Sequence, residues 1–152
     1  MILGGADYRD GALERLQESE MLLVAQSFAG SVYLAGRSVE GMLRALIWRR
    51  DVGIQQGKKS LETGHDLREL LVYVRNLGLL RAEGRDEEFE ARVQRVGRLW
   101  SNDLRFAPTR LVEAQWKKAG EVTNRRSLKL AAKEYFEDCS AIIKRCEVLW
   151  QN

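Results

Sequence analysis

The stretch that decides the fold is YLAGRSVEGMLRALI, residues 33–47, followed by GHDLRELL, residues 64–71. In the first stretch apolar side chains recur every three or four positions, which is the spacing of a buried helix face. Gly36 and Gly41 lie inside this helix, although a glycine costs a helix interior about 1 kcal/mol relative to alanine. We therefore predict that a neighbouring helix backbone comes close at both glycines. The second stretch predicts the capped start of the next helix.

Helical spacing continues along the chain on both sides of these two stretches. Thr63 and Asp66 form a predicted capping box, Pro108 ends or redirects one helix, and Thr109 caps the short helix that follows. Gaps in the pattern predict a break at 27–30 and a loop at 52–60. The predicted helices span 8–26, 31–51, 66–77, 86–102, 109–119 and 127–150. They predict one all-α domain, residues 1–152, folded as an antiparallel up-and-down bundle of about five helices.

Composition argues against several classes of protein. The apolar runs are only a few residues long, and the first ten residues lack the basic and apolar regions of a signal peptide. We therefore expect a cytoplasmic protein that makes no membrane contact. Cys139 and Cys146 lie seven positions apart on one predicted helix face, so we expect no disulfide between them. With one histidine, the chain has too few ligands for a zinc site, and we expect no metal or cofactor.

In their order and spacing, residues 33–47 and 64–71 resemble the core of a HEPN domain, a small helical bundle that recurs in nucleotide-handling and RNA-cleaving proteins. Residues 100–106, WSNDLRF, are similar to a segment of related domains that reads tryptophan, a few residues, then leucine, arginine and an aromatic residue. The likeness extends from Leu13 to Leu149. It implies a helical bundle that forms a homodimer. Some similar domains act with a nucleotidyltransferase partner, and others cut RNA without metal.

The cutting members of this family use an arginine, four to six further residues and then a histidine, usually late in the chain. Here the only histidine is His65, and the nearest preceding arginine is Arg50, fifteen positions earlier. Arg125 and Arg126 occupy the usual place of the motif, but no histidine follows them. We therefore expect a HEPN-like module that binds nucleotide or RNA without catalysis, as an accessory to a nucleotidyltransferase or in a toxin–antitoxin or other defence system.

Two other functions remain open from the sequence. One is a divergent, metal-independent endoribonuclease that uses Arg37, Asp103 or Arg105 in place of the missing motif. The other is a structural bundle that binds only proteins.

Six residues are candidates for a phosphate- or ligand-binding site. Arg37, Glu40 and Arg44 share one face of their helix, which predicts either a polar pocket or, more commonly, a ladder of ion pairs. His65, at a helix start, predicts either phosphate contact and acid–base chemistry or a packing and capping role. For these residues we expect a groove beside the second and fourth long helices.

Asp103 and Arg105, near the end of the fourth predicted helix, complete this set. They predict either a site residue with Arg105 as the anion binder or a salt bridge that locks the helix end.

Residues 105–133 are the best candidate for contact with nucleic acid. Eight basic and two acidic side chains give this segment a net charge of +6, against +3 for the whole chain. Basic side chains would neutralise phosphates, and an exposed tryptophan could stack on a base. The alternative is a solvated face with the tryptophan packed inward. The predicted contacts are Arg110, Trp116, Lys117, Lys118, Arg125 and Arg126.

Overall fold

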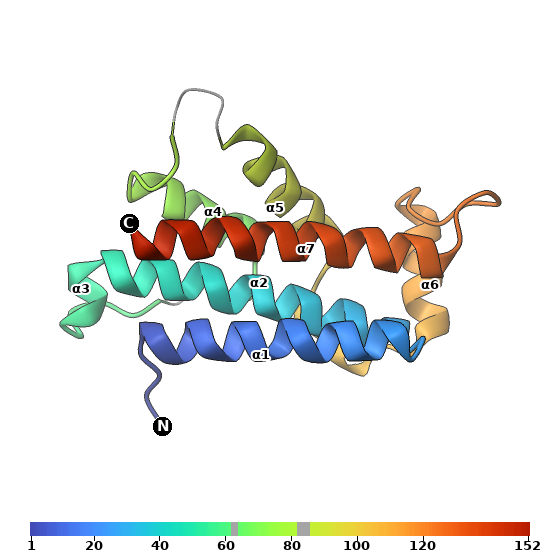
Figure 1. Ribbon diagram of the computed structural model, residues 1–152, viewed down its shortest axis with the longest axis horizontal. Helices are drawn as coiled ribbons and strands as arrows, with labels where there is room; N and C mark the ends of the chain where they lie inside the picture. Colours follow the sequence, from blue (N-terminus) through green and yellow to red (C-terminus); the bar gives the residue numbers. More distant parts are fainter. Residues whose placement is uncertain (62–63, 82–85) are drawn as a thin grey trace.

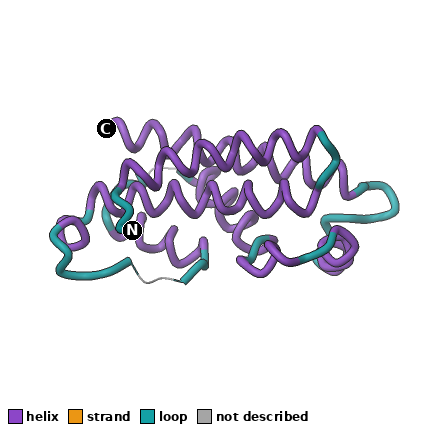
Figure 2. Tube along the Cα trace, turned by 90° about the horizontal axis from the view of Figure 1, so that it is seen from below, coloured by secondary structure: helices purple, strands orange, loops and turns teal. Residues whose placement is uncertain are grey.

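The computed structural model of the chain describes residues 1–61, 64–81 and 86–152, and the described part contains helices and no strand. The prediction of an all-α fold is therefore confirmed, and Figure 2 shows helices joined by loops throughout. The elements are α1 (Gly5–Val24), α2 (Phe28–Arg50), α3 (Val52–Gln55), α4 (Leu67–Asn76), α5 (Glu87–Leu99), the 3-10 helix η1 (Asn102–Phe106), α6 (Thr109–Lys118) and α7 (Leu128–Gln151).

Three long helices, α1, α2 and α7, lie side by side along the length of the molecule (Figure 1). Arg9 near the start of α1 pairs with Glu147 near the end of α7 at 2.6 Å. Arg50 at the end of α2 donates a hydrogen bond to the carbonyl oxygen of Leu149, also near the end of α7. Helix α7 therefore runs parallel to α2, and α1 runs antiparallel to both. The strictly antiparallel order expected from the sequence is not found, because the segments between α2 and α7 return the chain to the end where α2 begins.

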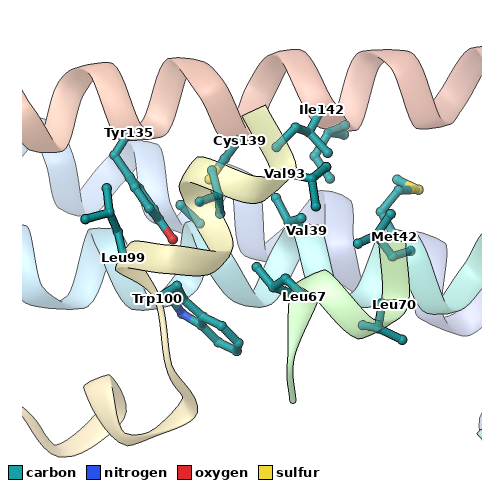
Figure 3. Packing of buried hydrophobic residues seen from close by; sticks show 14 of the residues in the cluster. Val39, Met42, Leu67, Leu70, Val93, Leu99, Trp100, Tyr135, Cys139 and Ile142 are labelled. Carbon is teal, nitrogen blue, oxygen red and sulfur yellow. The ribbon is translucent and has the colours of Figure 1, made fainter. Parts of the chain in front are cut away.

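Helices α4 and α5 form a short antiparallel pair that packs against α2 and α7. Arg75 at the end of α4 pairs with Glu90 at the start of α5, at 2.8 Å. The core lies between these four helices, where apolar side chains from each of them interlock (Figure 3). Full burial of one such side chain stabilises the fold by about 1.5–3 kcal/mol, so the buried side chains together hold the four helices in this arrangement. Core members labelled in Figure 3 include Val39, Met42, Leu67, Leu70, Val93, Tyr135, Cys139 and Ile142.

The two glycines of α2 allow close contacts of different kinds. A Cβ atom added at Gly41 would lie 3.3 Å from the backbone oxygen of Tyr8 and 3.2 Å from the Cβ of Ala12, so α1 approaches α2 at this point. The predicted backbone approach is therefore confirmed at Gly41. At Gly36 the added atom would lie 2.2 Å from the ring of Trp100, so the close neighbour there is a side chain. The indole N–H of Trp100 also donates to the carbonyl oxygen of Tyr33 at 3.1 Å.

Several predicted helix ends differ from the structure. Helix α1 begins at Gly5 instead of Tyr8, and α2 begins at Phe28, so Gly30 lies inside a helix and not in a break. The predicted loop after α2 contains α3, because the Asp51 carboxylate accepts hydrogen bonds from the backbone N–H groups of Gly53 and Ile54.

Helix starts and stops around α4, α5 and α6 differ as well. Asp66 caps α4 by accepting from the N–H of Arg68, while Thr63, its predicted partner, lies outside the described residues. Helix α5 ends at Leu99 because Trp100 is extended, and η1 follows. Pro108 precedes α6, so Thr109 is the first residue of that helix and not its cap.

Both cysteines are buried free thiols, as the sequence predicts. Burial is the main cause that raises the pKa of the Cys139 thiol well above its ordinary value. Among the described helices, none combines the length and the apolar character needed to cross a lipid bilayer.

Candidate functional site

A hollow of about 560 Å³ opens between α1 and α2, with the turn before α4 at its rim. It combines aromatic and aliphatic walls with charged groups of both signs, which is the make-up of many ligand sites. The residues that line it are Leu3, Asp7, Tyr8, Gly11, Ala12 and Arg15 from the first segment, Tyr33, Leu34, Arg37, Glu40, Gly41 and Arg44 from α2, and His65 from the turn.

Four of the predicted site residues meet at this hollow, and we call Arg37, Glu40, Arg44 and His65 the Glu40 cluster. The Glu40 side chain is only 3% exposed, and its carboxylate receives all three partners. Arg37 Nη1 lies 2.6 Å from Oε2, while Arg44 Nε and His65 Nδ1 lie 2.9 and 2.8 Å from Oε1. The predicted sharing of one helix face is confirmed, and the fold adds His65 from a separate segment.

Arg44 explains how the histidine comes to lie at this carboxylate. Its guanidinium donates to the carbonyl oxygen of Leu61 at 3.0 Å and to that of Gly64. Gly64 has a φ of +58°, a left-handed conformation that glycine adopts without strain. One half-buried arginine therefore ties the turn before α4 to the side of α2, and this tie brings His65 to Glu40.

The histidine ring is oriented by its contact with the acid. Since a carboxylate only accepts hydrogen bonds, we assign a proton to Nδ1, which donates a hydrogen bond to Glu40. The other ring nitrogen, Nε2, takes no part in this hydrogen bond. The His65 side chain is 47% exposed and that of Arg37 is 36% exposed, whereas Arg44 lies deeper. A ligand in the hollow can therefore reach Arg37 and His65, with Glu40 and Arg44 behind them.

Asp103 and Arg105 do not belong to this site. Both lie on η1, where Asp103 lines a separate hollow of about 290 Å³ and the Arg105 guanidinium lies 4.5 Å from the centroid of the Phe106 ring. The groove predicted beside the second and fourth long helices is therefore wrong for the Glu40 cluster, whose hollow lies between α1 and α2.

Sequence reasoning also missed the wall that α1 provides, including Tyr8 and Arg15. Gly11 and Ala12 on α1 and Gly41 on α2 are small residues at this wall, and Gly41 packs against Ala12. Small residues on two successive helices are the signal that could have indicated their contact.

The structure places the predicted nucleic-acid contacts in three different environments: buried, paired with an acid, and exposed. Trp116 is fully buried against Tyr135, with ring centroids 5.3 Å apart, so it cannot stack on a base as proposed from the sequence. It faces inward because it lies one helical turn after the buried Val112. Arg126 and Lys117 are engaged in ion pairs with Glu134 and Glu113. Arg110, Lys118 and Arg125 are exposed and pair with no acid in the described part of the chain.

A second buried glutamate collects cations elsewhere in the molecule, and we call Glu121, Arg95, Arg98 and Arg126 the Glu121 cluster. Arg95 and Arg98 each approach the Glu121 carboxylate to 3.0 Å, and Arg126 approaches it to 3.6 Å. Burial by itself would raise the pKa of Glu121, but the hydrogen bond from Arg95 and the charges of the three arginines outweigh burial and lower it. This cluster lines neither of the two hollows described above.

Within the described residues, no group of three or more histidine, cysteine, aspartate or glutamate side chains is placed to hold a metal ion. Comparison of the chain with protein-family models, with curated proteins and with solved structures finds no match. What the protein binds is therefore inferred from the Glu40 cluster and its hollow.

Proposed function

We propose that this chain is a HEPN-like module that binds a phosphate of RNA or of a free nucleotide in the hollow between α1 and α2, without cleaving it. The observation that carries this proposal is the Glu40 cluster, in which a buried acid holds two arginines and a histidine at the wall of a hollow of about 560 Å³. The proposal includes the homodimer and the accessory role beside a nucleotidyltransferase, or in a toxin–antitoxin or defence system, that the sequence resemblance implies.

Charge and shape both support a phosphate ligand. The hollow is lined by three arginines (Arg15, Arg37 and Arg44) and two acids (Asp7 and Glu40), a net charge of +1 before His65 is counted. A planar guanidinium suits phosphate oxygens because it can donate two parallel hydrogen bonds. Glu40 orients Arg37 and His65 in advance, so little side-chain freedom is lost when a ligand binds. The rings of the two tyrosines on the wall offer apolar surface to a base.

Binding of labelled single-stranded RNA and of a fluorescent adenosine nucleotide tests this proposal. We expect Arg37→Ala to weaken binding of at least one of these probes about tenfold, and to reduce the dependence of RNA affinity on salt. Arg98→Ala is the matched control, because Arg98 also pairs with a buried glutamate but lies away from the hollow. We expect this control to bind within about twofold of wild type.

Two results would contradict the proposal. Absence of RNA and nucleotide binding by the wild-type protein would favour the structural bundle that binds only proteins. An equal loss in Arg37→Ala and Arg98→Ala would show that binding depends on general positive charge and not on the Glu40 cluster.

One observation favours a second function, a divergent metal-independent endoribonuclease. Glu40 orients His65, and an oriented imidazole beside an arginine is the arrangement of a general base with a phosphate-binding partner. In such a reaction His65 Nε2 would take the proton of an RNA 2′-hydroxyl, and the 2′-oxygen would attack the adjacent phosphorus. The bond from phosphorus to the 5′-oxygen would break, the leaving oxygen would take a proton from water, and Arg37 would balance the phosphate charge.

Incubation of end-labelled RNA with the protein in EDTA separates the two functions. The binding proposal expects intact RNA. Metal-independent cleavage that is lost in His65→Asn and Arg37→Ala, and retained in Arg98→Ala, would favour the ribonuclease. Cleavage retained in all three variants would point to a contaminating nuclease.

A further inference from the structure

Phe106 is the one aromatic side chain of this protein that is turned out into solvent. The chain has four phenylalanines, four tyrosines and four tryptophans, all within the described residues, and the other eleven are buried or half-buried. Phe106 is 77% exposed. A single exposed apolar side chain is ordinary, so its surroundings decide whether it has a role.

The backbone that carries Phe106 is held firmly. The neighbouring Leu104 is buried, and Trp100, just before η1, packs on Gly36 and donates a hydrogen bond to Tyr33. The N–H of Ala107 donates to the carbonyl oxygen of Leu104 at 3.1 Å. The ring is therefore presented from an anchored segment, and less conformational freedom is lost when a ligand packs on it.

Groups that suit a nucleobase lie beside the ring. The Arg105 guanidinium lies 4.5 Å from the ring centroid, in position for a cation–π contact. The hollow of about 290 Å³ next to it combines the apolar Leu111 with the polar side chains of Ser101, Asp103 and Gln115. Apolar surface can cover the face of a base, while a carboxylate, an amide and a hydroxyl can hydrogen-bond with its edge.

The charges around the hollow, three cations against the Asp103 carboxylate, favour nucleic acid over an apolar protein partner. Arg105, Arg110 and Lys118 are exposed and form no ion pair with any residue that the structure describes. Lys118 lies on the same face of α6 as Leu111 and Gln115, because these positions are spaced by four and three residues. A phosphate backbone that passes the Phe106 ring would therefore meet unneutralised cations on both η1 and α6.

We propose that Phe106, Arg105 and the adjoining hollow form a stacking platform for an unpaired base of single-stranded RNA. The ligand class rests on the proposed RNA-binding function, but this surface is separate from the hollow between α1 and α2. The platform replaces Trp116, which the sequence suggested for this role and which the fold buries. A duplex keeps its bases stacked inside the helix, so the platform discriminates against double-stranded RNA.

Fluorescence anisotropy with a twelve-nucleotide adenosine RNA, single-stranded or paired with uridine RNA, tests the platform. We expect Phe106→Ala and Phe106→Leu each to weaken single-strand binding about five- to hundredfold, since both remove the aromatic face. Phe106→Trp should bind as tightly as wild type or more tightly. Met21→Ala is the matched control, because Met21 is 71% exposed on α1 and does not line the hollow. We expect duplex binding to change less than twofold in every variant.

The outcomes separate this inference from the proposed function. Wild-type affinity in Phe106→Ala would overturn the platform. Wild-type affinity in Phe106→Leu would also overturn it, because an aliphatic side chain would then be sufficient for binding. If Arg37→Ala weakens binding while the Phe106 series does not, the hollow between α1 and α2 is supported and the platform is rejected. If the wild-type protein binds no RNA, the platform is rejected, and the proposed function is rejected with it unless the protein binds the adenosine nucleotide. In that event, capture of an acidic protein through Phe106 becomes the alternative.

Discussion

The Glu40 cluster and the Glu121 cluster have nearly the same chemistry. In each, a buried glutamate is surrounded by three side chains that can carry positive charge, and the main contacts measure between 2.6 and 3.0 Å. They differ in what adjoins them. The Glu40 cluster forms part of the wall of a hollow, whereas the partners of Glu121 come from α5 and from the loop before α7.

This difference teaches that ion-pair chemistry by itself does not identify a site. The Glu121 cluster ties the loop between α6 and α7 to α5, and it extends through Arg95 to Asp138 on α7. The Glu40 cluster likewise ties a turn to α2, but α1 leaves space in front of it. The position of a neighbouring helix therefore separates a candidate binding site from a structural tie.

The largest effect on stability is expected from Glu121→Ala. Removing the acid takes away the partner that the three arginines share, although Arg95 keeps Asp138 and Arg126 keeps Glu134, and should lower the free energy of unfolding by about 2 kcal/mol. Affinity of the folded protein for RNA should stay within about twofold of wild type. Urea unfolding and RNA titration of the same sample measure both quantities. A marked loss of RNA affinity in the folded variant would show that the Glu121 cluster also takes part in binding, which would contradict the distinction between the two clusters.

A smaller effect is expected from a methyl group added at Gly41, in the wall of the hollow. In Gly41→Ala the new Cβ meets the backbone oxygen of Tyr8 and the Cβ of Ala12 at 3.2–3.3 Å, and neither can move without shifting α1. We expect a loss of about 1 kcal/mol and weaker ligand binding. Gly97→Ala on α5 is the control, because its added Cβ meets the Arg68 side chain at 3.0 Å, and a flexible side chain can move away. That variant should be as stable as wild type or more stable, since alanine favours helix.

A third carboxylate, that of Asp51, extends the comparison to a structural contact whose contribution to stability depends on pH. Hydrogen bonds from Lys59 and Tyr73 lower the pKa of Asp51 from its ordinary value of 3.8 to about 2. Because the pKa is lower in the folded state, the stabilisation is present above about pH 4 and is lost as the pH falls toward 2. Asp51→Asn should therefore be less stable at neutral pH and show a shallower decline of unfolding free energy between pH 4 and pH 2. Equal slopes in the two proteins would contradict this assignment.

The smallest effect is expected from Arg98→Ala. The Arg98 side chain is 55% exposed, and Arg95 and Arg126 still neutralise Glu121 in its absence. Exposed ion pairs contribute about 0–1 kcal/mol to stability, so the midpoint temperature of thermal unfolding should fall by no more than a few degrees. A loss comparable to that of Glu121→Ala would show that Arg98 is a principal member of the cluster.

Much of the fold could be predicted from local pattern. The apolar spacing of residues 33–47 predicts α2, and the stripe from Leu67 to Val74 predicts α4 with Asp66 as its cap. The direction of α7 could not be predicted, because a helix buries the same face whichever way it runs. The end of α5 at Leu99 was missed because Trp100 is extended where it packs on Gly36, and that contact joins residues far apart in the sequence.

For the candidate site, the sequence predicts the shared face of Arg37, Glu40 and Arg44, since positions three and four apart are neighbours on a helix. It also names His65, but the contact with Glu40 spans 25 residues and depends on the tie from Arg44 to Gly64. Trp116 shows the opposite case. The basic residues around it in the sequence suggest an exposed ring, and only the packing against Tyr135 shows that the ring is buried.

The sequence by itself determined the long helices, the cap of α4 and the common face of the charged residues on α2, because these follow from interactions between residues close together in the chain. The tertiary structure decided which helices touch, where a hollow remains, and which aromatic ring faces solvent. Those features depend on contacts between distant segments, here between α1 and α2 at Gly41 and between α2 and Trp100 at Gly36. Local spacing constrains each helix, but only packing selects its neighbours.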